Sequence, residues 1–519
     1  MYYDKNAVKK HGIGVELDTA FGGFDIVIGN PPWERLEQSN RNFLINLYRQ
    51  KTNKSWTKLA PSDKAKFKNS VLPQIEEHQR MLKKQEALRI YLKNKYVIQG
   101  RGMPELFKLF MERSVGLLSR SGSLGLLVPS AIYSGVECSE LRKELFRKMT
   151  VHSIIAFENR KNIFPTIDSR ENFCIILAKA NGTTLSFKFG FKHYHLQDLH
   201  CLTLFDVSIK TISRFSPEHL IIPEATEDDY LIKTKMVKHP SLGSPAWPFI
   251  VTTEFQTSKD KALFRKNKTE GKAELYQGSA ICQFEIRPSK IRLYVDHKEA
   301  QSKLIAMEKK RLQKIQVSTI NKTPIIKTDA QNYRVAWRAI ARNTDNRTMI
   351  STVLPPNVFH AHSIWSLRPM VLTQTGEYKF QYSLPTCMYL CGIFNSVPFD
   401  YLVRQLVYKN VSKSILQKIP VPAYDEKNVY HKQISKITSR LIAVGPQYTK
   451  LRKSLQIIEI INSAERKQAI AAVNAYSALA YSLTRKDLLH ILSKFHVQNK
   501  KSPTFQYLII EEYDKILNY

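Results

Sequence analysis

The residues best suited to chemistry in this chain are the tetrapeptide Asn30-Pro31-Pro32-Trp33. Two consecutive prolines fix φ and remove two N–H donors, which leaves a stiff loop of exposed carbonyls. An exocyclic amino group on a nucleobase donates two hydrogen bonds, and the Asn30 side-chain oxygen and the Pro31 carbonyl could accept both. The nitrogen would then approach tetrahedral geometry and displace an activated methyl group, with geometry and desolvation supplying most of the rate. Trp33 offers a flat face on which an extruded base can stack.

The element that must position this tetrapeptide is the apolar run at residues 24–29, which lies between Gly22-Gly23 and the first proline. A short β-branched run that ends at proline predicts a buried strand. In an open α/β sheet the C-terminal end of such a strand faces the ligand crevice. The alternative is a proline-rich turn with Trp33 in the core. The preceding strand favours the chemical interpretation.

The segments that follow predict the rest of a sheet. Apolar spacing indicates a helix at 104–118, a strand at 124–128, a helix at 137–148 and strands at 151–157 and 172–178. Alternating strands and helices are typical of a parallel α/β sheet, here with an antiparallel hairpin expected at its edge.

Residues 51–103 interrupt this pattern. They carry 13 Lys or Arg against 4 Asp or Glu, with apolar residues at helical spacing. We expect a basic helical insertion there. It is either a solvated face or, as we favour, a surface that contacts phosphates.

Five segments, in order, resemble the gamma-type N6-adenine DNA methyltransferases of type IIG restriction-modification and phage-defence systems. Residues 24–33 (FDIVIGNPPW) look like motif IV, 106–110 like the helix after it, and 120–130 (RSGSLGLLVPS) like motif VI. Residues 162–165, followed by 173–176, look like motif VIII.

The resemblance implies roles for single residues and a cofactor, S-adenosylmethionine. Asn30 to Trp33 would be catalytic, Phe110 would contact the cofactor adenine, and Asn30 would lie at the methyl side of the cofactor. Phe164 would pack, with Trp33, on the flipped adenine. The implied fold is the C-terminal part of a Rossmann-like class I methyltransferase sheet.

Beyond residue 185 the similarity is to the target-recognition domain of the same family. We therefore expect a catalytic domain at 1–185, an α+β target-recognition domain at 186–425 and a helical region at 426–519. Residues 286–343 are basic, with 14 Lys or Arg against 4 Asp or Glu. The marks of the similarity are the segments at 215–217, 275–278, 342–348 and 392–396.

The front of the chain departs from the family pattern. Family members carry a Gly-rich loop that cradles the cofactor several elements before the motif IV tetrapeptide. Only 29 residues precede Asn30 here, and Gly12-Ile13-Gly14 lies too close to serve. The resemblance thus implies a C-terminal portion, with a separate N-terminal half or a nuclease subunit as a further partner.

Composition bounds the partners and the compartment. The 519 residues carry a net charge of +34, which makes a polyanion such as double-stranded DNA the first partner to consider. No apolar run could span a bilayer and no signal peptide is visible, so we expect no membrane partner. Six scattered cysteines suit a reducing cytoplasm. The His193/His195 and His360/His362 pairs lack further ligands at metal spacing, so no metal is expected.

These observations predict a site-specific DNA adenine-N6 methyltransferase that is incomplete without an N-terminal half. One alternative is a methyltransferase that acts on RNA or on protein glutamine, although about 330 residues follow motif VIII and a compact glutamine enzyme needs no such domain. The other is a catalytically inactive DNA-binding or specificity subunit.

Overall fold

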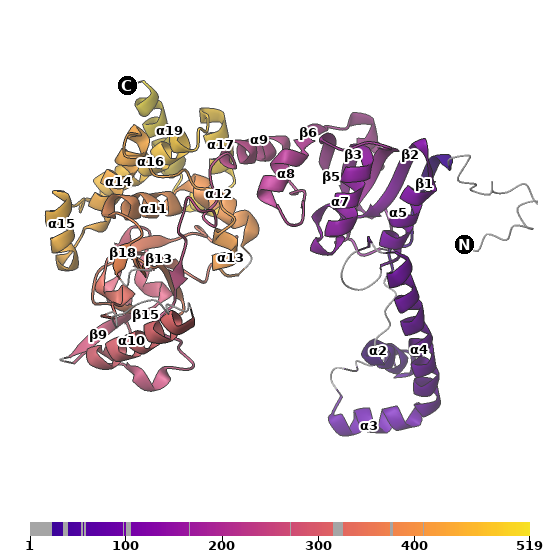
Figure 1. The fold of residues 1–519 in the computed structure, drawn as a ribbon, viewed down its shortest axis with the longest axis horizontal. Coiled ribbons are helices and arrows are strands. Elements are labelled where there is room, and N and C mark those ends of the chain that lie inside the picture. The colour runs from indigo at the N-terminus through magenta and orange to yellow at the C-terminus, as the bar shows by residue number, and fades with distance from the viewer. Residues whose placement is uncertain are drawn as a thin grey trace, which may run out of the picture. The chain divides into compact units, whose positions relative to one another are not determined.

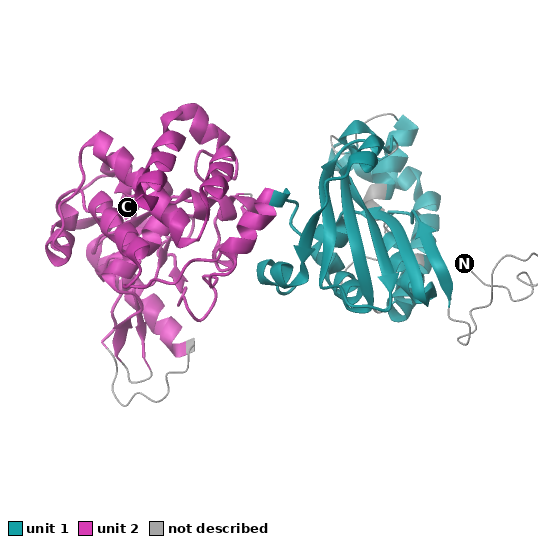
Figure 2. Cartoon of the chain, turned by 90° about the horizontal axis from the view of Figure 1, so that it is seen from above, with its two compact units in different colours: residues 1–227 teal, residues 228–519 magenta. Residues whose placement is uncertain are grey.

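The computed structural model forms two compact units, Met1–Glu227 and Asp228–Tyr519, coloured separately in Figure 2. No described helix is long and apolar enough to cross a membrane. The structure describes residues 23–34, 40–52, 56, 59–96, 98–99, 105–165, 167–269, 271–314, 325–373, 377–407 and 409–518.

The first unit is built on a six-stranded mixed sheet in the order β1-β2-β4-β3-β5-β6. β1 pairs parallel with β2, and β3 pairs parallel with β5. β4 runs antiparallel to both β2 and β3, so the reversed strand lies inside the sheet and not at the edge where we expected it. The β3–β4 connection, residues 159–171, returns the chain between two strands that already run the same way. The strands are β1 (Phe24–Gly29), β2 (Leu118–Pro129), β3 (Met149–Glu158), β4 (Asn172–Ala180), β5 (Ser186–His193) and β6 (Phe205–Ser208).

Helices α5 (Leu106–Leu117) and α7 (Ser139–Lys148) pack against this sheet, α5 on β2 and α7 on β3 (Figure 1). Both are amphipathic, and their apolar stripes supply buried side chains such as Met111 and Leu145. Short α6 (Ala131–Ser134) follows β2, and α8 (Ile209–Phe215) follows β6. These helices leave one face of the sheet uncovered at its β1 end.

That uncovered face is apolar. Ile28 of β1 is directly opposite Gly125 of β2, which is opposite Leu177 of β4, so these three residues share one face. Ile26 and Ile28 are 66% and 80% exposed, and Leu177 is 42% exposed. The opposite face, with Leu124, is buried. Among the described residues, no strand pairs with the outer edge of β1.

The predicted basic insertion contains helices. They are α3 (Pro61–Ser70) and α4 (Leu72–Lys95), and α2 (Asn40–Thr52) ends at the start of the predicted segment. Tyr48, Trp56 and Phe67 form a small aromatic core, with ring centroids 4.8 to 5.8 Å apart. Phe43 of α2 stacks on His78 of α4 at 4.0 Å. Residues 53–55, 57–58, 97 and 100–103 of the predicted segment lie outside the described residues.

The second unit combines small sheets with many helices. Two four-stranded sheets have the orders β14-β13-β16-β7 and β15-β9-β12-β8. The strands are β7 (Val251–Thr252), β8 (Phe264–Arg265), β9 (Lys272–Tyr276), β10 (Ile281–Cys282), β11 (Glu285–Ile286), β12 (Leu293–Asp296), β13 (Arg334–Arg338), β14 (Ser351–Leu354), β15 (Phe359–His360), β16 (Ile364–Leu367), β17 (Met370–Leu372) and β18 (Tyr378–Phe380). The helices are α9 (Glu227–Met236), α10 (His297–Lys314), α11 (Leu384–Asn395), α12 (Val397–Leu406), α13 (Lys413–Leu416), α14 (Val429–Ile442), α15 (Thr449–Leu455), α16 (Ser463–Ala480), α17 (Arg485–Ser493), α18 (His496–Lys501) and α19 (Thr504–Leu517).

The buried helix α11 joins these parts into one core. It contacts β13 and β14 on one side and α14 and α16 on the other. Nine of its twelve residues are buried, since it is apolar on every side. One hydrophobic cluster therefore runs from Trp337 of the sheet to Ile434 and Val473 of the helices.

The two expected domain limits fall inside continuous structure. Residue 185 separates β4 from β5, yet β5 and β6 extend the same sheet, and the first compact unit runs to Glu227. Residue 425 lies within the second unit, whose core spans both sides of it. Hydrogen bonding between strands and shared apolar burial, which local composition does not reveal, account for both differences. The functional assignment of each segment stays a prediction.

Candidate active site

The tetrapeptide Asn30 to Trp33 lies where β1 ends, and it lines a cavity of about 890 Å³. Pro129 and Ala131, at the C-terminal end of the neighbouring parallel strand β2, line the same cavity. Carboxyl ends of parallel strands meet at one edge of a sheet, and this edge is where open α/β folds hold ligands. The remaining lining residues are Glu34, Glu105, Phe107, Glu137, Ile167 and Glu171.

Asn30 is exposed within this cavity wall, whereas Pro31 is buried. Among the described residues, the Asn30 side chain has no hydrogen-bond partner. The two prolines hold the chain beside it in a restricted conformation. The arrangement presents an acceptor on a stiff support, and its role in holding a base stays a prediction.

Trp33 sits against an aromatic cluster. Its ring lies edge-on to Phe164, with centroids 5.7 Å apart, and its centroid is 5.8 Å from that of Phe173. Phe173 stacks in turn on Phe157 at 5.3 Å. The fold thus brings together the two residues predicted to stack on a base, although 131 positions separate them in the sequence. The buried Trp33 Nε1 donor lacks a hydrogen-bond partner among the described residues.

The loop that carries Phe164 is organised by Asn159, which follows β3 and is fully buried. Asn159 Nδ2 donates to the carbonyl oxygens of Phe164 and Ile167, at 3.0 and 3.1 Å. Its Oδ1 accepts from the Phe164 N–H at 2.9 Å. The Asn159 N–H donates to the Glu171 carbonyl, which closes the loop at the start of β4. Sequence reasoning missed this residue, because an asparagine after a strand is also a common turn residue.

Carboxylates give the cavity its charge. Glu34, Glu105, Glu137 and Glu171 line it, and Lys108 Nζ lies 2.9 Å from a Glu105 carboxylate oxygen. The chain has a net charge of +34, whereas several carboxylates line this cavity, so the charge here is locally negative. It therefore suits a ligand that is cationic or rich in hydrogen-bond donors.

Helix α5 presents a different phenylalanine to the cavity from the predicted one. Phe107 lines the cavity and is 2% exposed. Phe110, the predicted contact of the cofactor adenine, is 49% exposed and is not part of the lining. The two are one turn apart, so the rotation of the helix on the sheet decides between them. The structure does not bring Phe110 together with the tetrapeptide.

Two further buried groups lie behind the cavity wall. The Arg142 guanidinium donates to the carbonyls of Ile132, Gly135 and His219, and burial lowers its pKa to about 10. Burial raises the pKa of the Cys138 thiol to about 12. A thiol that stays protonated is a poor nucleophile, so Cys138 has a packing role here.

No group of three or more His, Cys, Asp or Glu side chains in the described part of the chain is arranged to hold a metal ion. His360 is buried with Nε2 3.0 Å from the Ser366 hydroxyl, and burial lowers its pKa to about 3. Cys387 and Cys391 are buried on α11.

Two sequence comparisons find similarity to restriction-modification methyltransferases. Residues 77–164 match the family model described as Eco57I restriction-modification methylase. A putative type II restriction enzyme and methyltransferase of Methanocaldococcus jannaschii is 27% identical over 133 residues, which are 26% of this chain and 7% of that protein.

Among solved structures, the type IIL restriction-modification enzyme MmeI in complex with DNA is similar at 9% identity and a TM-score of 0.35, over 92% of this chain and 57% of that one. The type IIG restriction endonuclease BpuSI is similar at 10% identity and a TM-score of 0.30, over 96% of this chain and 55% of that one. The chain thus spans little more than half of these solved chains and a small part of the curated relative.

The family match includes α5, β2, α7 and β3, and it ends at Phe164. Residues 77–164 are therefore similar to a restriction-modification methylase.

Proposed function

We propose that this chain supplies the catalytic loop and the target-recognition part of a site-specific DNA methyltransferase that modifies the N6 amino group of an extruded adenine. The observation that carries the proposal is the tetrapeptide Asn30 to Trp33 at the end of β1, on the wall of a cavity and with Trp33 against Phe164. The match of residues 77–164 to a restriction-modification methylase supports it.

The chain's own residues would act by holding the base. The Asn30 side-chain oxygen and the Pro31 carbonyl accept the two hydrogens of the amino group, which directs its lone pair towards the methyl donor. Trp33 and Phe164 provide aromatic surface for the extruded base, at a stacking energy of about 1–3 kcal/mol. Phosphate contacts elsewhere supply most of the affinity for the duplex.

The cavity fits the proposed cofactor, S-adenosylmethionine, in its chemistry. That molecule supplies an activated methyl group on a cationic sulfonium, together with an ammonium and an adenine. Carboxylates such as Glu34 and Glu137 favour such a cation, and the apolar part of the lining, which includes Pro129 and Ile167, suits a base. Phe110 keeps its predicted role as a proposal, since its exposed ring could be covered by further polypeptide or ligand.

The sheet itself supports the view that more polypeptide completes the enzyme. Ile26 and Ile28 expose apolar side chains on a strand whose outer edge is unpaired among the described residues. Exposed edges and apolar faces of this kind promote association. We propose that an N-terminal methyltransferase half, in the same or a separate chain, covers this face. The sheet is then the C-terminal part of a Rossmann-like class I fold.

The two alternative functions differ in the methylated products that they predict. A methyltransferase that acts on RNA or on protein glutamine would leave DNA unmodified. An inactive specificity subunit would bind DNA without transferring a methyl group, and the open sheet favours this second candidate for the chain on its own.

A methylation assay separates these possibilities. The full chain, alone and with the N-terminal half of a relative, is incubated with unmethylated DNA and methyl-labelled cofactor, and the nucleosides are separated by mass. We expect N6-methyladenine from the reconstituted enzyme, none from Asn30→Ala, and an unchanged product level from Asn94→Ala, an exposed asparagine on α4. Another methylated product, or equal activity of Asn30→Ala, would refute the proposal.

A further inference from the structure

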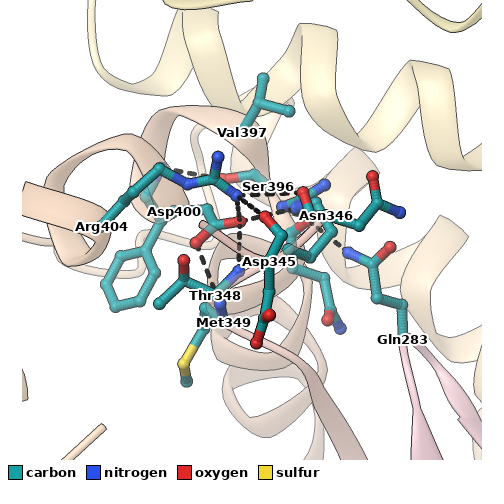
Figure 3. A network of polar contacts seen from close by, with 12 residues as sticks. Gln283, Asp345, Asn346, Thr348, Met349, Ser396, Val397, Asp400 and Arg404 are labelled. Atoms are coloured by element: carbon teal, nitrogen blue, oxygen red, sulfur yellow. Dashed lines mark hydrogen bonds and ion pairs between the residues drawn. The ribbon is translucent and has the colours of Figure 1, made fainter. Parts of the chain in front are cut away.

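A polar network in the second unit holds one surface loop in a single conformation. The loop joins β13 to β14, and Figure 3 shows the residues that surround its inner half. Arg347 Nε donates to Asp400 Oδ2 at 2.7 Å, and both side chains are almost completely buried. Asp400 also accepts the backbone N–H groups of Thr348 and Met349. Replacing a buried pair of this kind with apolar residues is often neutral or stabilising, so a role in defining conformation is the stronger explanation.

The outer half of the loop is tied to the same network through its backbone. Arg404 donates to the carbonyl oxygens of Asp345 and Asn346, at 2.8 and 3.0 Å. Asp345 Oδ2 accepts the Arg342 N–H at 2.9 Å, and the Thr348 hydroxyl donates to the Arg342 carbonyl at 3.1 Å. These bonds use main-chain groups and leave the side chains at the tip available.

The loop exposes four consecutive side chains, those of Arg342, Asn343, Thr344 and Asp345, and the first three form its tip. Among the described residues, the side chains of Arg342, Asn343 and Thr344 have no hydrogen bond or ion pair. The Ala341 N–H donates to the Lys409 carbonyl, which places the exposed Lys409 beside the tip. The surface thus combines two cations with an amide and a hydroxyl on an ordered backbone. Asp345 is the acidic residue of the loop and is itself exposed, so the two cations outnumber one anion; its Oδ2 accepts the Arg342 N–H.

These side-chain types match the chemistry of a nucleic-acid backbone. Arginine, lysine, asparagine and threonine are the side chains that commonly bond phosphate oxygens, and such contacts fix the register of a protein on a duplex. Arginine can meet a phosphate with two parallel hydrogen bonds. A loop that is already ordered loses little conformational entropy on binding.

We propose that the loop tip at residues 342–344, with Lys409, is a contact site for the phosphate backbone of double-stranded DNA. The inference rests on the proposed function and extends it, because it assigns a specific anchoring surface to the second unit. The buried Arg347–Asp400 pair is a positioning element for this surface.

The experiment measures binding of the full chain to a fluorescein-labelled DNA duplex several helical turns long, by anisotropy, across a series of NaCl concentrations. Arg342→Ala and Lys409→Ala are each expected to lower the slope of log Kd against log salt by about 1, since each removes one phosphate contact. Lys467→Ala is the control: it removes another exposed cation, on α16, and should leave the slope of log Kd against log salt unchanged.

A second pair of variants separates the order of the loop from its charge. Asp345→Asn and Asp345→Ala both remove one negative charge, but only asparagine retains an acceptor for the Arg342 N–H. We expect weaker DNA binding by Asp345→Ala than by Asp345→Asn. Equal affinities would overturn the positioning role of the turn.

The proposal and the proposed function fail in different ways. If Arg342→Ala and Lys409→Ala behave like Lys467→Ala while the wild-type chain binds DNA, this surface is not a contact site. If the wild-type chain binds no DNA, or binds an RNA duplex of the same sequence instead, the proposed function fails as well.

Discussion

Replacement of Asn159 tests the proposed site through one buried side chain that does not contact the substrate. Its amide makes hydrogen bonds of 2.9, 3.0 and 3.1 Å within the loop that carries Phe164. Asn159→Ala removes these bonds and leaves buried backbone groups unpaired. We predict a less stable loop, a displaced Phe164 ring and slower methyl transfer, with DNA affinity unchanged because phosphates provide it.

The magnitude follows from the bonds that are lost. A hydrogen bond contributes about 0.5–1.5 kcal/mol net, so the loss of these bonds should lower the free energy of unfolding by about 2–4 kcal/mol. A misplacement of a positioning group by about 1 Å can lower a rate about 100-fold. Asn159→Asp keeps the acceptor for the Phe164 N–H but turns a carboxylate oxygen towards two carbonyls, and it should be at least as damaging.

The assay combines urea unfolding of the chain with single-turnover methylation by the reconstituted enzyme and with gel-shift affinity. Base extrusion is followed in parallel with a duplex that carries 2-aminopurine at the target position. Asn94→Ala on the exposed face of α4 is the matched control. A wild-type rate and an unchanged unfolding curve for Asn159→Ala would refute the positioning role.

Three further predictions concern charge and exposed surface. Asp400→Asn leaves the Arg347 guanidinium buried without a carboxylate, so urea unfolding should show a loss of about 3–5 kcal/mol. Burial raises the pKa of Asp329 to about 6, so its protonated form stabilises the fold fully below pH ~4 and this stability is lost as pH rises through about 6. The midpoint of urea unfolding should therefore fall over this pH range in the wild-type chain but not in Asp329→Asn. Ile28 is 80% exposed, so Ile28→Glu should improve the solubility of the chain alone. The same change should weaken binding to an N-terminal half, measured by titration. Unchanged binding would contradict the proposal that this half covers the sheet face.

Part of the site was predictable because it is local. The run at residues 24–29 forms β1, and the tetrapeptide follows it at the carboxyl end, as the apolar run and the prolines predict. The predicted burial of this strand is wrong for the described residues, because β1 has no buried residue and Ile28 is 80% exposed. The alternation of strands and helices also indicates an α/β sheet in this half of the chain. These features depend on neighbouring residues, and a single sequence contains them.

Other parts depend on pairing across long separations. The antiparallel β4 lies inside the sheet, and β5 and β6 continue it beyond residue 185, because hydrogen bonds between strands set their order. Apolar periodicity cannot report this order. The same limit applies to α5, where the exposed Phe110 and the buried Phe107 are equivalent in the sequence pattern until the helix packs on β2.

The sequence by itself determined the chemistry that this protein can offer: an acceptor and two prolines after an apolar strand, a nearby aromatic, and a strong positive charge. Tertiary structure alone decided which residues meet. It placed Phe164 against Trp33, buried Asn159 beneath the loop, gathered carboxylates around the cavity, and joined Arg347 to Asp400 under the tip at Arg342. The reason is physical. Residue type and local spacing define what a side chain can donate or accept, whereas burial and the packing of distant segments define what lies within reach of it.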